Sequence, residues 1–129
     1  MPKLPENLRA HAEFAAHGLH KSRLWIDSLM TKYQLKLADR QCAMAELSQR
    51  IQDLVVMLTT SLYAGKHDDE VLRAAADVLC QDLRRRLTGS RPSSQYFRTV
   101  TKLGETIAEG GFKSLAGVDA PEILMRYEQ

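Results

Sequence analysis

No proline occurs between residues 6 and 91, because the four prolines of the chain lie at positions 2, 5, 92 and 121. Proline breaks a helix, since it lacks a backbone donor and its ring clashes with the preceding turn. Most of the chain is therefore free to form long helices. No segment alternates apolar and polar residues as a half-buried strand does. The sequence predicts an all-α protein.

Apolar residues recur at steps of three and four along the first half of the chain, which places them on one face of a helix. We predict helices over residues 6–31 and 35–63. The first stripe consists of Leu8, Ala12, Ala15, Leu19, Ile26, Leu29 and Tyr33, with Ser22 in its one gap. The second consists of Met44, Leu47, Ile51, Leu54, Leu58 and Leu62. Because Val55, Val56 and Met57 widen its apolar surface, we expect the second helix to be the most buried and covered on more than one side.

A turn and a loop separate these helices from two more. Gly65 suits a C-terminal cap, and Asp68 or Asp69 can cap a third helix over 69–87. The stripe of this helix consists of Leu72, Ala75, Ala76, Leu79, Leu83 and Leu87.

The fourth helix is predicted over 94–109, after a loop that ends near Ser93. Gly110 and Gly111 can provide its left-handed cap. Its inward-facing residues are expected to be Phe97, Val100, Leu103, Gly104, Ile107 and Ala108, with Gly104 allowing close approach of a neighbour. A further short helix is predicted over 120–127. Together these helices predict a single domain over 1–129, an up-down four-helix bundle with a short extra C-terminal helix.

The composition is that of an ordinary globular protein, with 44% hydrophobic residues and a net charge of +2. This charge is too small to indicate a nucleic-acid partner. The longest uninterrupted apolar run, Leu54 to Leu58, is far too short to span a membrane. No signal peptide is visible. Cys42 and Cys80 lack metal-type spacing and are expected to be buried free thiols, although a bridge between them stays open. We expect a cytoplasmic or equivalent reducing compartment.

The sequence offers no catalytic or cofactor-binding constellation, and we assign no catalytic, cofactor or metal residue. Neither a nucleophile elbow nor a Gly-rich phosphate loop is present. Glu13, His17 and His20 have the spacing of a partial metal set on one helix face, but no second set accompanies them. Residues 16–22 also faintly resemble the phosphoacceptor segment of histidine phosphotransfer domains. That interpretation would make His17 the phosphoacceptor, although the expected small residue is replaced by Lys21.

Arg84, Arg85 and Arg86 form a basic end to the third helix. Cations at this position are favourable to the helix dipole, which explains them without a ligand. The alternative is contact with a phosphate or another anion. Consecutive arginines point in different directions around a helix, which argues against one concentrated patch.

Residues 35–112 resemble the extra C-terminal helical domain of very-long-chain-type acyl-CoA dehydrogenases. The matching positions are Leu47, Asp53, Leu54 and Met57 in the second helix, Cys80 in the third, and Tyr96, Thr101, Lys102, Gly110 and Gly111 in and after the fourth. This resemblance implies a non-catalytic packing and assembly domain of an FAD enzyme that dehydrogenates acyl-CoA in fatty-acid oxidation.

The resemblance further implies that FAD and the catalytic Glu belong to a separate core with its own β-domain. In the family this appended domain packs on that core, favours dimers and is associated with membrane attachment. It therefore implies as partners the catalytic core of the same flavoprotein or a second copy, with peripheral contact at the inner membrane. The alternative is a freestanding helical interaction module, motivated by the heptad-like stripes of the first two helices. On this alternative the chain would be a complete product from Met1 to residue 129.

Overall fold

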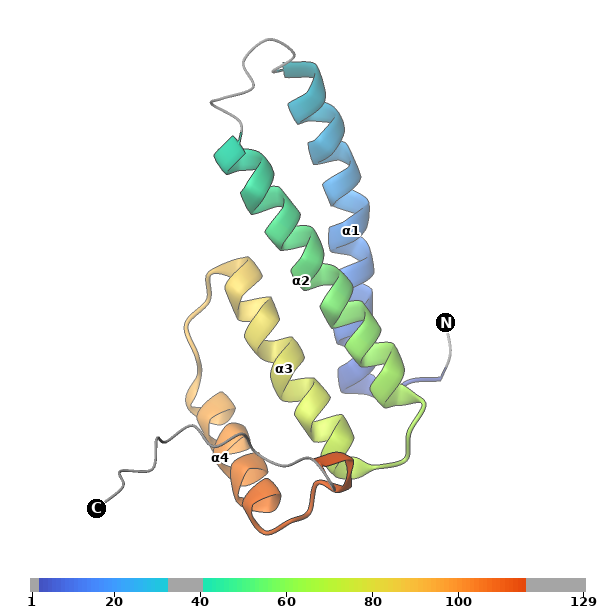
Figure 1. Ribbon diagram of the computed structural model, residues 1–129, viewed down its shortest axis with the longest axis vertical. Helices are drawn as coiled ribbons and strands as arrows, with labels where there is room; N and C mark the ends of the chain where they lie inside the picture. Colours follow the sequence, from blue (N-terminus) through green and yellow to red (C-terminus); the bar gives the residue numbers. More distant parts are fainter. Residues whose placement is uncertain (1–2, 33–40, 116–129) are drawn as a thin grey trace, which may run out of the picture.

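The computed structural model describes residues 3–32 and 41–115. The elements are α1 (Glu6–Lys32), α2 (Gln41–Gly65), α3 (Glu70–Thr88), α4 (Ser94–Ala108) and a short 3₁₀ turn, η2 (Lys113–Leu115). All regular structure within these residues is helical, which confirms the predicted fold class. Successive helices run in opposite directions, so the up-down order is also confirmed (Figure 1). The predicted segments at 33–40 and 120–127 lie outside the described residues.

Local capping chemistry fixes the helix ends. The Asp69 carboxylate accepts hydrogen bonds from the backbone N–H groups of Val71 and Leu72, and the Ser93 hydroxyl accepts one from Tyr96. Both side chains satisfy donors that the first turn of a helix leaves unpaired. Gly89 and Gly110 have φ angles of +72° and +80°, a backbone region that favours glycine. The predicted caps at Asp69 and Gly110 are therefore confirmed, and Ser93 provides a further cap.

The core lies where α3 packs against the long antiparallel pair of α1 and α2. One cluster of buried side chains consists of Ala15, Leu54, Met57, Cys80 and Leu83, and a second consists of Leu8, Ala64 and Ala76. Both clusters join residues of all three helices. Among the described side chains, α2 contributes more buried ones than any other helix, as the sequence predicted.

The predicted inward face of α4 is only partly right, because Leu103 and Ile107 are half-buried whereas Phe97, Val100 and Gly104 are exposed. No residue of α4 is buried, and the side chains of Phe97 and Val100 are 56% and 36% exposed. The physical reason is that α1 and α2 already occupy the buried side of α3, so α4 packs on the opposite edge of α3 (Figure 1). A Cβ atom added at Gly104 would meet no atom within 4 Å, so no described neighbour makes the expected close approach.

The prediction that the second helix is covered on more than one side is only partly right. Both α1 and α3 pack on it, yet Val55 and Val56 remain 47% and 44% exposed. The apolar stripe of α1 is also only partly buried, because Leu8, Ala12 and Ala15 are buried while Ile26 is exposed. The cause is the length of α3, which has 19 residues against 27 in α1. At 1.5 Å per residue, α1 is about 12 Å longer, so its C-terminal part packs beside α2 alone.

Candidate functional site

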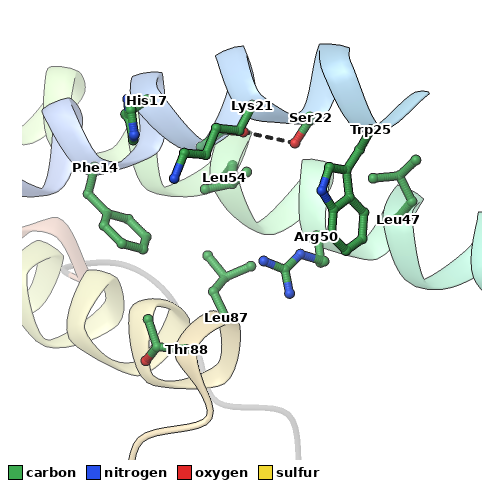
Figure 2. A pocket seen from close by; sticks show the side chains of 11 residues that line it. Phe14, His17, Lys21, Ser22, Trp25, Leu47, Arg50, Leu54, Leu87 and Thr88 are labelled. Carbon is green, nitrogen blue, oxygen red and sulfur yellow. Dashed lines mark hydrogen bonds between the residues drawn. The ribbon is translucent and has the colours of Figure 1, made fainter. Parts of the chain in front are cut away.

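A pocket of about 360 Å³ opens where α3 ends and the α1–α2 pair continues. Its lining consists of Phe14, His17, Gly18, Lys21, Ser22 and Trp25 from α1, Leu47, Arg50 and Leu54 from α2, and Leu87 and Thr88 from α3. Figure 2 shows Phe14, Trp25, Leu54 and Leu87 bordering the same space. We call this space the α3-end pocket. Its volume falls near the lower end of the range of small-molecule sites.

Among the described residues that line the α3-end pocket, the charged groups are basic. Lys21 and Arg50 line it, and no described Asp or Glu does. The Arg50 guanidinium lies 5.8 Å from the centre of the Trp25 ring, and that of Arg84 lies 4.4 Å from the Phe14 ring. Such positions over an aromatic face are favourable for a cation. The pocket therefore combines apolar walls with a positively charged rim.

The three consecutive arginines of α3 point to different partners. Arg86 pairs with Asp53 of α2 at 3.1 Å, and Arg85 pairs with Asp82 and lies over the Tyr96 ring. Arg84 lies over the ring of Phe14, a residue that lines the α3-end pocket. The structure does not gather these arginines into one anion site. Two of them instead join α3 to its neighbours.

A second apolar surface lies on the side of α3 between α2 and α4. An apolar trough of about 170 Å³ there is lined by Thr60, Tyr63, Ala64, Leu72, Ala75, Ala76 and Leu79. Val56 precedes Thr60 by four residues and so shares its side of α2. Ala75, Leu79, Asp82 and Arg86 follow one stripe of α3. This stripe lies between the two neighbours, because Asp82 accepts a hydrogen bond from Tyr96 of α4 and Arg86 reaches Asp53 of α2.

The fourth helix extends this apolar surface. Val100 lies one turn beyond Tyr96, and α4 runs antiparallel to α3, so Val100 is level with Leu79, about one turn before Asp82. We call the exposed apolar side chains on this side of the three helices the open face; they are Val56, Tyr63, Leu79, Phe97 and Val100. Large exposed apolar side chains that adjoin one another are typical of a contact surface.

A buried polar link between α1 and α3 was missed by sequence reasoning. His11 Nε2 lies 2.8 Å from Asp77 Oδ1, and both side chains are largely buried. The hydrogen bond from His11 lowers the pKa of Asp77 most strongly, and a hydrogen bond from Gln81 acts in the same direction. Because an ionised carboxylate only accepts, Nε2 carries the proton that His11 donates. Nδ1 of His11 is buried without a partner among the described residues.

The residues that carry the sequence resemblance differ in how deeply they are buried. Leu47, Asp53, Leu54 and Met57 are buried, Tyr96 is half-buried, and Lys102, Gly110 and Gly111 are exposed. Asp53 also accepts a hydrogen bond from Gln49, so it is tied to both α2 and α3. The α2 residues that carry the resemblance are therefore buried parts of the domain.

Glu13, His17 and His20 are exposed on α1, and Glu13 pairs with Arg9 at 3.0 Å. His17 lies near the middle of α1, as a phosphoacceptor would, and its side chain lines the α3-end pocket. No group of three or more His, Cys, Asp or Glu side chains suited to a metal ion occurs in the described ranges. Cys80 is a buried free thiol, and burial raises its pKa.

Comparisons with known proteins found no matching family model, curated protein or solved structure. In the part of the chain that the structure describes, no helix combines the length and apolarity needed to cross a membrane.

Proposed function

We propose that the chain is a non-catalytic helical packing domain, which docks through its open face on the catalytic core of an acyl-CoA dehydrogenase-like FAD enzyme. The exposed apolar side of α4 is the observation that carries this proposal. Phe97 and Val100 belong to an amphipathic helix in which no side chain is fully buried, and both of them are exposed. Burial of apolar surface is favourable by about 25 cal/mol per Å². Covering the exposed apolar side of α4 with a partner would therefore be favourable.

The identity of the partner follows from the sequence resemblance. The matching residues span α2 to the end of α4, and those in α2 form the core of the domain. We assign FAD, the catalytic base and the acyl-CoA site to the partner core, and none of them to this chain. The role of the domain is to cover part of that core and to stabilise its assembly.

The test is purification of the tagged protein from its native source. The proposal predicts one flavin for each copy of the chain, with the flavin absorption bleached when an acyl-CoA is added. A flavin-free homodimer would favour the freestanding interaction module instead. A flavin-free monomer would remove the support for both.

A matched pair of variants tests the docking surface. Val100→Glu places a charge on the open face, whereas Gln95→Glu places the same charge on an exposed position of α4 outside this face. Val100→Glu is expected to weaken the assembly, because docking would bury an unpaired carboxylate. Gln95→Glu is expected to leave it unchanged. Equal effects of both variants would contradict docking through the open face.

A further inference from the structure

We propose that the α3-end pocket binds a soluble, single-chain anionic amphiphile, such as an alkyl carboxylate or an alkyl phosphate. This inference is independent of the proposed function, because the pocket shares no residue with the open face. Its basis is the combination of apolar walls and unneutralised basic groups that the end of α3 creates.

The walls favour a hydrocarbon chain. Phe14, Leu47, Leu54, Trp25 and Leu87 line the pocket, and the Trp25 side chain is 59% exposed. A chain placed against these residues would remove apolar surface of both molecules from water. The volume of about 360 Å³ is large enough for one short hydrocarbon chain.

The rim favours a negative head group. The ammonium of Lys21 and the guanidinium of Arg50 are exposed, and neither forms an ion pair within the described ranges. The Arg84 guanidinium lies over the ring of Phe14, which lines the pocket, although Arg84 itself is not among the lining residues. A carboxylate or phosphate can accept charge-assisted hydrogen bonds from such groups, and an arginine can bind either of them with two bonds. A cationic head would be repelled.

The protein contains its own reporter for this site. Trp25 is the single tryptophan of the chain and lines the pocket, so its fluorescence responds to a bound chain. Decanoate and decyl phosphate are the probes. Decyl maltoside and decyltrimethylammonium carry the same chain on neutral and cationic heads. All four are titrated below the concentrations at which they form micelles, and calorimetry measures the same affinities without relying on fluorescence.

The proposal predicts saturable binding of both anionic probes, at least about tenfold tighter than binding of the neutral and cationic ones. Arg50→Gln and Lys21→Gln are each expected to weaken decanoate binding by about threefold to tenfold. Lys66→Gln, which removes an exposed cation between α2 and α3, is the control and should have no effect.

Two results would overturn the proposal. Equal affinity for the four probes would show that the pocket binds the hydrocarbon chain without selecting the charge of the head group. Binding to anionic vesicles without any binding of the soluble probes would assign the basic rim to a membrane surface. Circular dichroism of each variant confirms that it is folded, which is expected because both substituted side chains are exposed.

Discussion

His11 of α1 donates a hydrogen bond to Asp77 of α3 over 2.8 Å, and this pair is largely buried beside the core. Replacement of Asp77 by alanine removes the acceptor and leaves the buried imidazole donor without a partner. We expect Asp77→Ala to lower the free energy of unfolding by about 1–3 kcal/mol, measured by urea denaturation. Asp68→Ala is the control, because the Asp68 side chain is fully exposed and its contact with Arg73 is long. Equal stability of Asp77→Ala and the wild type would contradict a stabilising role of the pair.

The same pair predicts a dependence of stability on pH. The folded-state pKa of Asp77 lies below its ordinary value of 3.8. A carboxyl with a depressed pKa stabilises the fold above its unfolded pKa, and this contribution is lost as the pH falls through the folded pKa. The difference in unfolding free energy between wild type and Asp77→Asn should therefore be constant near neutral pH and shrink below about pH 4. Urea denaturation over a pH series measures it, and a difference that grows in acid would have the wrong sign.

The open space around Gly104 predicts a stabilising substitution. A Cβ atom there meets nothing within 4 Å, and alanine is favoured over glycine inside a helix by about 0.5–1 kcal/mol. Gly104→Ala should stabilise α4 in the isolated chain, measured by hydrogen exchange of residues 94–108. Gly89→Ala is the contrasting variant, because the positive φ of Gly89 makes a Cβ there cost about 1–2 kcal/mol despite the free space. Faster exchange in Gly104→Ala would contradict the described surroundings of this residue.

The Cys80 thiol should be unreactive in the folded protein. Its side chain is fully buried, and burial raises its pKa, so little thiolate is present and reagents cannot reach it. In a Cys42→Ser variant, Cys80 is the single remaining thiol of the chain. Mass spectrometry after alkylation should show slow modification in buffer and rapid modification in urea. Rapid modification in buffer, with the circular dichroism intact, would place the thiol at the surface.

The sequence predicted the helices well because their signals are local. The Asp69 and Ser93 caps lie within three residues of the N–H groups that they satisfy. The stripe of Leu8, Ala12 and Ala15 correctly marks the buried side of α1. Periodicity along one helix is enough to identify such a stripe.

The misses concern relationships between helices. The stripe of α4 indicates that one side is apolar, but it does not indicate which helix covers that side, and Phe97 proved to be exposed. His11 and Asp77 are 66 positions apart, so no local spacing predicts that they meet. The α3-end pocket depends on where α3 stops beside α1 and α2, a relation that is fixed by tertiary packing.

Hydrogen exchange of residues 94–108 tests the proposed docking most directly, when the isolated chain is compared with the flavin-containing assembly from the native source. In the isolated chain we expect α4 to exchange faster than α2, because α4 has no buried residue and α2 contributes Leu54 and Met57 to the core. In the assembly we expect α4 to be protected, because its apolar side is covered. Unchanged exchange of α4 in a flavin-containing assembly would contradict docking through the open face.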